Sequence, residues 1–250
     1  MKPKVSIVTP AYNAADSIRE VYESIKNQTF KDWEWLVVDD CSKDDTFKIL
    51  GDIAAKDHRV RIFQNPKNSR AAVSRNFATQ MATGKFIAFL DADDMWKPKK
   101  LEHQIKFMEK YGYEYTYTNY DVHRFGGETK EFRPKISISN YKIMLRQCDV
   151  GCLTVIYDAE KIGKIYMPEN CPNREDYAAW LTVMKNGVVA HKLDENLAIY
   201  SVGKSTAVTT DKVKIFKSHY HVYRHYMKFN WFKSAYFICA FTFHKIFKGY

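Results

Sequence analysis

Short hydrophobic runs alternate with amphipathic segments through the first hundred residues. The runs are rich in β-branched and aromatic residues, which is typical of strands covered on both faces. They predict strands at 5–9, 35–38, 60–63 and 86–90. Between the runs, apolar residues recur at helical spacing and predict helices at 16–27, 46–55 and 71–82. Strand–helix alternation with short connections indicates right-handed βαβ units and a mainly parallel sheet flanked by helices, so the predicted fold class is α/β.

The second half of the chain has a looser pattern. A helix is expected from Pro98 to about residue 111, strands at 113–120 and near 153–157, and a helix at 174–185. The chain from Lys212 onward predicts a helical tail, so we divide the protein into a domain of residues 1–210 and a tail of residues 211–250. No apolar run reaches the roughly 18 residues that a membrane-spanning helix needs, and the N-terminus lacks the apolar stretch of a signal peptide.

Charge divides the chain in the same way. The formal net charge is +10, and residues 212–250 hold eight Lys or Arg and no acid, together with 13 of the 38 aromatic residues. A basic, aromatic tail on a near-neutral body predicts an anionic partner surface, either a membrane face or nucleic acid. The five cysteines are odd in number and form no C-x-x-C pair, which argues against a disulfide framework and fits a reducing cytoplasm.

Polar residues collect where the predicted strands end. The segments that follow strands one, two and four are Pro10-Ala11-Tyr12-Asn13, Asp39-Asp40-Cys41-Ser42 and Asp91-Ala92-Asp93-Asp94. Ligands of open parallel sheets bind beyond the carboxyl ends of the strands, so five carboxylates and one aromatic ring converge there. Repulsion among them predicts a divalent cation. Taken singly, Asp40 or Ser42 has the plainer reading of a helix cap, Tyr12 of a core edge, and residues 91–94 of a turn.

Five stretches in this order resemble the inverting family 2 glycosyltransferases with a GT-A fold. They are VSIVTPAYN at 5–13, VVDDCSKDDT at 37–46, AAVSRN at 71–76, FLDADDMWKPKKLE at 89–102 and REDYAAWL at 174–181. Within that family the chain looks most like bacterial enzymes that assemble cell-surface polymers of the teichuronic-acid, capsule and lipopolysaccharide kind. The resemblance implies a sugar transfer from a UDP-sugar to a hydroxyl of a growing, lipid-linked glycan.

The resemblance assigns the nucleotide site to the first two strand ends. It places the backbone of Pro10 and Ala11, the ring of Tyr12 and the carboxylate of Asp40 around a uracil base. An aromatic face stacks on a base, and a carboxylate accepts a hydrogen bond from an imide N–H. Arg75 stands where the family often has an arginine near the nucleotide, but it fits equally well as an ion-pair partner of the acidic cluster.

The third strand end corresponds to the family's D-x-D element. Asp93, with Asp94, is implied to hold Mg²⁺ or Mn²⁺ against the diphosphate, while Asp91 or Asp93 approaches the ribose. Hard cations of this kind bind through oxygen ligands, and both ions use the same set. The ion would stabilise the charge that builds on the departing UDP.

Glu175 and Asp176 match the family's ED motif. Asp176 is the candidate general base, because an attacking acceptor hydroxyl must lose a proton in a single inverting displacement. Without the family, the two carboxylates have the simpler reading of first-turn acids that stabilise the dipole of the 174–185 helix. Trp180, one turn further on, either forms the floor under the acceptor sugar or belongs to the core.

Two departures from the family bear on the diphosphate site and its loop. Tyr200 is followed by Ser201 where the family often has arginine, so that contact is absent or comes from Lys204. The loop before Arg75 reads Asn68-Ser69-Arg70-Ala71 in place of a glycine-rich sequence. Cys152 and Thr154 are candidates for lining the site only because of their position near the strand expected at 153–157.

The tail leaves two alternatives open. It rests on anionic lipid at the inner face of the cell membrane, or it packs back on the body or forms a dimer contact. Rival functions are transfer directly to a polyprenyl phosphate and, in another class, nucleic-acid binding by the tail. An edge of the sheet that carries five aspartates repels phosphates, so we expect no nucleic-acid partner.

Overall fold

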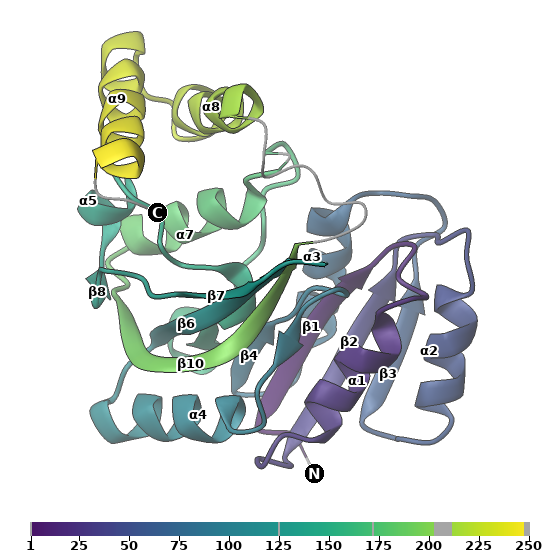
Figure 1. Cartoon of the computed structure of the whole chain (residues 1–250). Helices are drawn as coiled ribbons and strands as arrows, with labels where there is room; N and C mark the ends of the chain where they lie inside the picture. Colours follow the sequence, from purple (N-terminus) through teal and green to yellow (C-terminus); the bar gives the residue numbers. More distant parts are fainter. Residues whose placement is uncertain (1, 125, 172, 203–211, 248–250) are drawn as a thin grey trace.

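A ten-stranded mixed sheet forms the centre of the molecule, and helices cover both of its faces (Figure 1). The computed structural model describes residues 2–124, 126–171, 173–202 and 212–247. The strands lie in the order β3-β2-β1-β4-β9-β6-β10-β5, with β7 on β6 and β8 on β10. The α/β class predicted from the sequence is confirmed.

The first half contains the elements that the sequence predicts. The strands are β1 (Val5–Ala11), β2 (Trp33–Asp39), β3 (Val60–Gln64) and β4 (Phe86–Phe89), and the helices are α1 (Ile18–Lys26), α2 (Thr46–Ala54) and α3 (Ala71–Met81). All pairings among these strands are parallel. Successive residues of the strands point to opposite faces: Ile7 packs in the hydrophobic cluster with α1 and α2, whereas Val8 packs in the cluster with α3.

The second half departs from a mainly parallel sheet. Its strands are β5 (Met95–Trp96), β6 (Tyr115–Arg124), β7 (Thr129–Phe132), β8 (Ile138–Ser139), β9 (Ile156–Asp158) and β10 (Ala190–Val202). β9 is antiparallel to both β4 and β6, whereas β10 runs parallel to β6. The predicted strand near 153–157 is therefore wrong in its first residues, because a 3₁₀ turn (Cys152–Thr154) occupies them.

Most helices of this half lie on one side of the sheet. They are α4 (Lys100–Tyr111), α5 (Tyr141–Met144), α6 (Ala159–Ile162), α7 (Glu175–Lys185), α8 (Lys212–His221), a π-helical turn (Val222–Tyr226) and α9 (Trp231–Phe247). α4 belongs to the cluster with α1, and α7 belongs to the cluster with α3. The helices expected after Pro98 and at 174–185 are confirmed, and so is the helical character of the tail.

The tail packs back on the body. The hydroxyl of Tyr223 lies 2.8 Å from that of Tyr177 on α7, and Tyr226 lies 3.0 Å from Thr182. Phe237 and Ile238 of α9 belong to the same hydrophobic cluster as α7. The predicted boundary between residues 210 and 211 lies outside the described residues, so that division stays a prediction. None of the helices in the described part of the chain has both the length and the apolar character that crossing a bilayer requires.

Candidate active site

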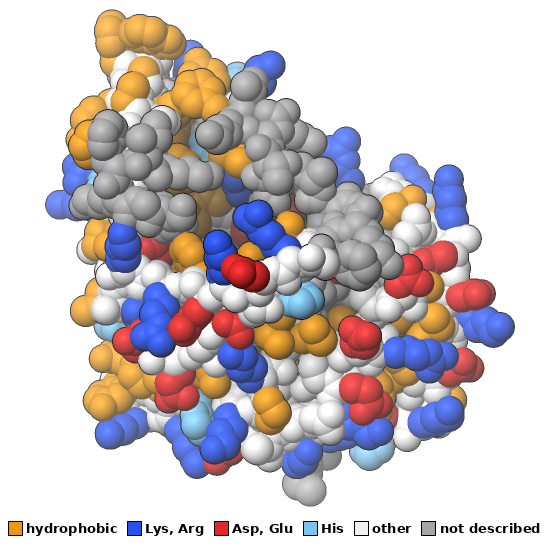
Figure 2. Space-filling view, viewed as in Figure 1, with side chains coloured by type: hydrophobic (Ala, Val, Ile, Leu, Met, Phe, Trp, Pro, Cys, Tyr) orange, Lys and Arg blue, Asp and Glu red, His pale blue; other side chains and the backbone are white. Residues whose placement is uncertain are grey.

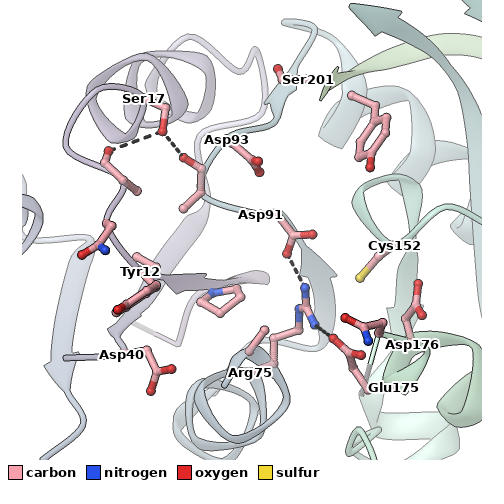
Figure 3. A pocket seen from close by; sticks show the side chains of 18 of the residues that line it. Tyr12, Ser17, Asp40, Arg75, Asp91, Asp93, Cys152, Glu175, Asp176 and Ser201 are labelled. Atoms are coloured by element: carbon pink, nitrogen blue, oxygen red, sulfur yellow. Dashed lines mark hydrogen bonds and ion pairs between the residues drawn. The ribbon is translucent and has the colours of Figure 1, made fainter. Parts of the chain in front are cut away.

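A cavity of about 600 Å³ opens beyond the carboxyl ends of β1 and β4 (Figure 3). It brings together nine of the residues that the sequence suggested for nucleotide binding, metal binding or catalysis. These are Pro10, Ala11, Tyr12, Asp40, Arg75, Asp91, Asp93, Glu175 and Asp176. In Figure 3, Tyr12 and Asp40 lie at one end and Asp176 at the other, with Arg75 and Asp91 between them. The volume lies in the range of small-molecule sites.

Arg75 joins the two acidic motifs across the cavity. One of its terminal nitrogens lies 2.5 Å from Asp91 and the other 3.2 Å from Glu175. Burial disfavours the charged guanidinium, but the nearby charges, Asp91 first, outweigh it and raise the pKa of Arg75 well above its ordinary value. The alternative that Arg75 is an ion-pair partner of the acidic cluster is confirmed. Glu175 is thereby held in place by a cation.

Asp176 has a different environment from its neighbour Glu175. Its Oδ1 accepts a hydrogen bond of 2.7 Å from the amide of Tyr177, in the first turn of α7. Burial, with the charge of Glu175, raises the pKa of Asp176, and the charge of Arg174 only partly opposes this. A carboxylate with a raised pKa holds a proton more strongly, as a general base must.

Asp93 and Asp91 form the acidic pair of the D-x-D element. Desolvation and the charge of Asp91 raise the pKa of Asp93 to about 6. Asp91 is balanced by Arg75, whereas no ion pair neutralises Asp93 among the described residues. In the part of the chain that the structure describes, no three His, Cys, Asp or Glu side chains are grouped to hold a metal by themselves. A divalent ion here would take its other ligands from phosphate and water, as Mg²⁺ commonly does.

Asp94 does not fit the predicted role of metal ligand. It is 1 % exposed and does not line the cavity. Its Oδ1 accepts a hydrogen bond of 2.9 Å from the amide of Ser201, near the end of β10. The structure thus corrects this assignment, because successive side chains in the 91–94 turn point in different directions and Asp94 faces the sheet.

Asp40 holds the loop that leads into α3. Its oxygens accept hydrogen bonds from the Asn65 side chain and from the amides of Ser69 and Arg70, at 2.6, 2.8 and 2.7 Å. A carboxylate offers about four acceptor positions, so one remains for a ligand. Asp39, the first member of the DD pair, is fully buried and accepts from the Ser42 amide and Gln64. Only the second member of the pair therefore reaches the cavity.

Arg70 occupies a backbone conformation that suits glycine. Its φ is 75° and its ψ is 162°, while its side chain is exposed. This region costs a non-glycine residue about 1–3 kcal/mol. The two hydrogen bonds that Asp40 accepts from Ser69 and Arg70 hold the strained loop in place.

We expect Arg70→Gly to raise the free energy of unfolding by about 1 kcal/mol, because relief of strain exceeds the added entropy of the unfolded chain. Urea denaturation measures the change. Arg70→Ala is the matched control, since it removes the same side chain but keeps the Cβ that causes the strain. An equal gain in both variants would contradict the argument.

Trp180 is a core residue. It is fully buried, and its ring lies 5.7 Å from Phe89 and 5.4 Å from Tyr115, measured between ring centroids. It does not line the cavity, so the suggestion that it forms the floor under an acceptor sugar is wrong. Trp180 lies four residues after Asp176 on α7, and the helix presents it to the sheet rather than to the cavity.

Several cavity residues were not predicted from the sequence. Arg174 and Ser17 line the cavity, and so do Ile215 and Ser218 of α8. Cys152 lines it as its position suggested, whereas Thr154 is fully buried and its carbonyl accepts from Gln104. Tyr200 and Ser201 also contribute, and Lys204 lies outside the described residues. The acidic and basic candidates were visible as motifs, but nothing in the tail marks Ile215 as a wall of this cavity.

The α/β sheet, the acidic pair at its carboxyl edge and a separate desolvated carboxylate are the arrangement that the resemblance to glycosyltransferases with a GT-A fold implies. The chain belongs to glycosyl transferase family 2, whose family model matches residues 6–162. The enzyme class and the fold that the sequence predicted are thereby confirmed.

Relatives and solved structures agree with this assignment. The chain is 38 % identical over 236 residues to Bacillus subtilis TuaG, a glycosyltransferase assigned to teichuronic acid biosynthesis, covering 92 % of this chain and 93 % of TuaG. It is 37 % identical over 210 residues to WfaP of Escherichia coli, a UDP-Glc:alpha-D-GlcNAc-diphosphoundecaprenol beta-1,3-glucosyltransferase, covering 84 % and 81 %. The crystal structure of S. aureus TarS 1–349 with UDP-GlcNAc has a TM-score of 0.72 at 20 % identity, covering 98 % and 73 %, and shows the same fold.

Proposed function

We propose that this enzyme transfers one sugar, with inversion, from a UDP-sugar to a hydroxyl of a growing, lipid-linked cell-surface glycan. The observation that carries the proposal is the position of Asp176. It shares one cavity with Tyr12, Asp40 and the acidic pair, yet no cation lies within salt-bridge distance of it among the described residues. The names of TuaG and WfaP support the surface glycan, and that of WfaP supports the UDP donor and the lipid-linked acceptor.

In this proposal the donor nucleotide lies at the Tyr12 end of the cavity. The exposed ring of Tyr12 provides a face on which a base can stack, and the fourth acceptor position of Asp40 receives the imide N–H of uracil. The backbone of Pro10 and Ala11 borders the same end. Arg75 pairs with Asp91 and Glu175 and so fixes the positions of both carboxylates, between which and the Tyr12 end the ribose and diphosphate would lie (Figure 3).

Asp176 acts at the opposite end as the general base. The acceptor hydroxyl attacks the anomeric carbon while its proton passes to the free oxygen of Asp176, and the bond from that carbon to UDP breaks. Glu175, tied to Arg75, keeps the α7 N-terminus against the donor side. The raised pKa of Asp176 suits this proton transfer near neutral pH.

The residues present fit a divalent cation, Mg²⁺ or Mn²⁺, at Asp93. The raised pKa of Asp93 means that the structure does not compensate its negative charge, and a bound cation would do so. Asp93 would be the protein ligand, with the donor's diphosphate as the other anionic partner. Such an ion stabilises negative charge on the leaving diphosphate.

The outer face of α9 supports a membrane contact. Its exposed apolar residues follow helical spacing along one stripe, which consists of Phe232, Tyr236, Cys239 and Phe243. Trp231 is also exposed beside it, and the exposed bases nearby are Arg224, Lys228 and Lys233. Figure 2 shows hydrophobic side chains gathered over α9. Aromatic rings flanked by bases fit an anionic bilayer surface, so we place the enzyme peripherally at the inner face of the cell membrane, where lipid-linked acceptors lie.

Vesicle binding tests this placement. We expect Phe232→Ser to weaken binding to phosphatidylglycerol-containing vesicles about tenfold, because one buried phenylalanine contributes about 1.5–3 kcal/mol. Co-sedimentation measures the binding. Tyr166→Ser is the control, since Tyr166 is also an exposed aromatic residue but lies outside the tail. Equal vesicle binding by the wild type, Phe232→Ser and Tyr166→Ser would refute a role of the stripe.

Ligand-dependent stability tests the donor site. The purified protein is heated with UDP, GDP or CMP, each with and without Mn²⁺, because a ligand that binds the native state raises its stability. We expect a rise with UDP that requires the metal. No rise with any nucleotide would overturn the proposed donor, and a panel of UDP-sugars follows from a positive result.

A further inference from the structure

We infer that a second cavity, behind Asp176, binds the phosphate group of a sugar-diphosphate acceptor. The inference rests on the proposed function and adds the acceptor's recognition to it. This cavity has a volume of about 190 Å³. It is lined by Gln147, Cys148, Arg174, Asp176, Tyr177, His219, Phe241 and His244.

The two cavities meet at the proposed base. Arg174 and Asp176 line both of them, while the other residues of the small cavity come from the 147–148 segment, α7, α8 and α9. A donor in the large cavity and an acceptor in the small one would therefore approach Asp176 from different sides. The transfer requires the acceptor hydroxyl to reach both Asp176 and the anomeric carbon, and the shared wall of the two cavities is where that can happen.

Nitrogen atoms without partners mark the small cavity as a site for an anion. Arg174 Nε and His244 Nδ1 are buried and have no hydrogen-bond partner among the described residues. A buried polar atom left unsatisfied costs about 1–3 kcal/mol. Arg174 Nε always donates and His244 Nδ1 donates when it carries a proton, so a ligand that accepts hydrogen bonds can satisfy both. Phosphate oxygens do so and also neutralise the charge of Arg174.

The volume selects a small group. Sites for whole organic ligands are typically larger than about 300 Å³, so this one suits a phosphate or a fragment of a sugar but not a complete nucleotide. The larger cavity already provides the aromatic face and the acidic pair that a nucleotide requires. Between a phosphate and a neutral fragment, the guanidinium and imidazole nitrogens favour the phosphate.

The small cavity lies beside α9, the helix proposed to contact the membrane, and this position suits an acceptor anchored in a bilayer. His244 adjoins Phe243, the last residue of the exposed α9 stripe, and Phe241 of the same helix lies 4.0 Å from His219, measured between ring centroids. One helix thus presents its outer face to solvent and its inner face to the small cavity. A lipid diphosphate held at α9 would leave its sugar near Asp176.

Two acceptors and one control variant test the inference. The acceptors are a water-soluble alkyl diphosphate of N-acetylglucosamine and the alkyl glycoside of the same sugar without phosphate. We expect His244→Gln to raise the KM for the diphosphate acceptor about tenfold, with the KM for the UDP-sugar and turnover of the glycoside unchanged. Arg174→Gln should raise the same KM further. His225→Gln is the matched control, because His225 is an exposed tail histidine that lines neither cavity.

Each other outcome has a definite meaning. An unchanged KM for the diphosphate acceptor in His244→Gln and Arg174→Gln would overturn the inference, and so would equal losses with both acceptors. Calorimetric titration of the diphosphate acceptor into the UDP complex gives a readout that needs no turnover, so a failure of the proposed reaction remains distinguishable. Phosphatidylglycerol vesicles should bind the wild type and His244→Gln equally. A difference there would assign these nitrogens to a lipid headgroup instead.

Discussion

Sugar transfer is expected to fall by about 10²–10⁴-fold when Asp176 is replaced by asparagine, because a positioned general base contributes a factor of that size. The substitution keeps the shape of the side chain and an oxygen that can accept from the Tyr177 amide. The metal-dependent rise in stability with UDP should remain, since Asp176 lies at the far end of the cavity from Tyr12. Initial rates and thermal unfolding of the same preparation measure the two effects.

Glu175→Gln is the matched control for this experiment. The neighbouring side chain has the same charge and starts the same helix, but it pairs with Arg75, and an amide oxygen can still accept from that guanidinium. We expect a loss well below that of Asp176→Asn. Equal losses would contradict the assignment of Asp176 as the base. Activity that survives Asp176→Asn with a polyprenyl phosphate as the acceptor would favour the rival reaction, whose nucleophile is already ionised.

The second large effect concerns Asp93. Asp93→Asn should weaken metal-dependent binding of the UDP-sugar about 100-fold, because an ion held against a diphosphate contributes several kcal/mol. Asp94→Asn is a strict control, since it alters the adjacent carboxylate, which faces the Ser201 amide and not the cavity. Calorimetric titration of each variant with UDP-sugar in the presence of Mn²⁺ measures the two affinities. Loss of binding in Asp94→Asn alone would restore the ligand assignment made from the sequence.

In the absence of metal, Asp93→Asn should stabilise the fold, although the same substitution weakens donor binding. Burial and the charge of Asp91 raise the pKa of Asp93 to about 6, so the folded state resists ionisation of this group. As pH rises from about 4, the unfolded chain ionises first and stability falls until the pH passes 6. Removal of the carboxylate should therefore raise the free energy of unfolding above pH 6, on the order of 1 kcal/mol, and have no effect below pH 4. Urea denaturation at pH 4 and pH 8 measures this.

Tertiary contacts decided which members of each motif reach the cavity. Asp91, Asp93 and Asp94 look alike in the sequence, but one pairs with Arg75, one faces the cavity and one accepts from the end of β10. These differences depend on partners up to 107 residues away. No local pattern specifies partners at that separation, and the same limit applied to Trp180, whose place on α7 allowed either face.

Local sequence patterns suffice to predict the first half of the sheet and the edge at which the site forms. Buried strands and amphipathic helices are marked by local periodicity, and parallel strands necessarily present their carboxyl ends together. The sequence did not determine β10, whose polar and apolar residues mix because the strand is only half buried and its register with β6 is irregular at 193–198. Nor did it determine that α8 lines the cavity, because a basic aromatic helix fits a membrane, a partner or its own body equally well. In the structure the tail packs on its own body, where the hydroxyl of Tyr223 contacts that of Tyr177 on α7.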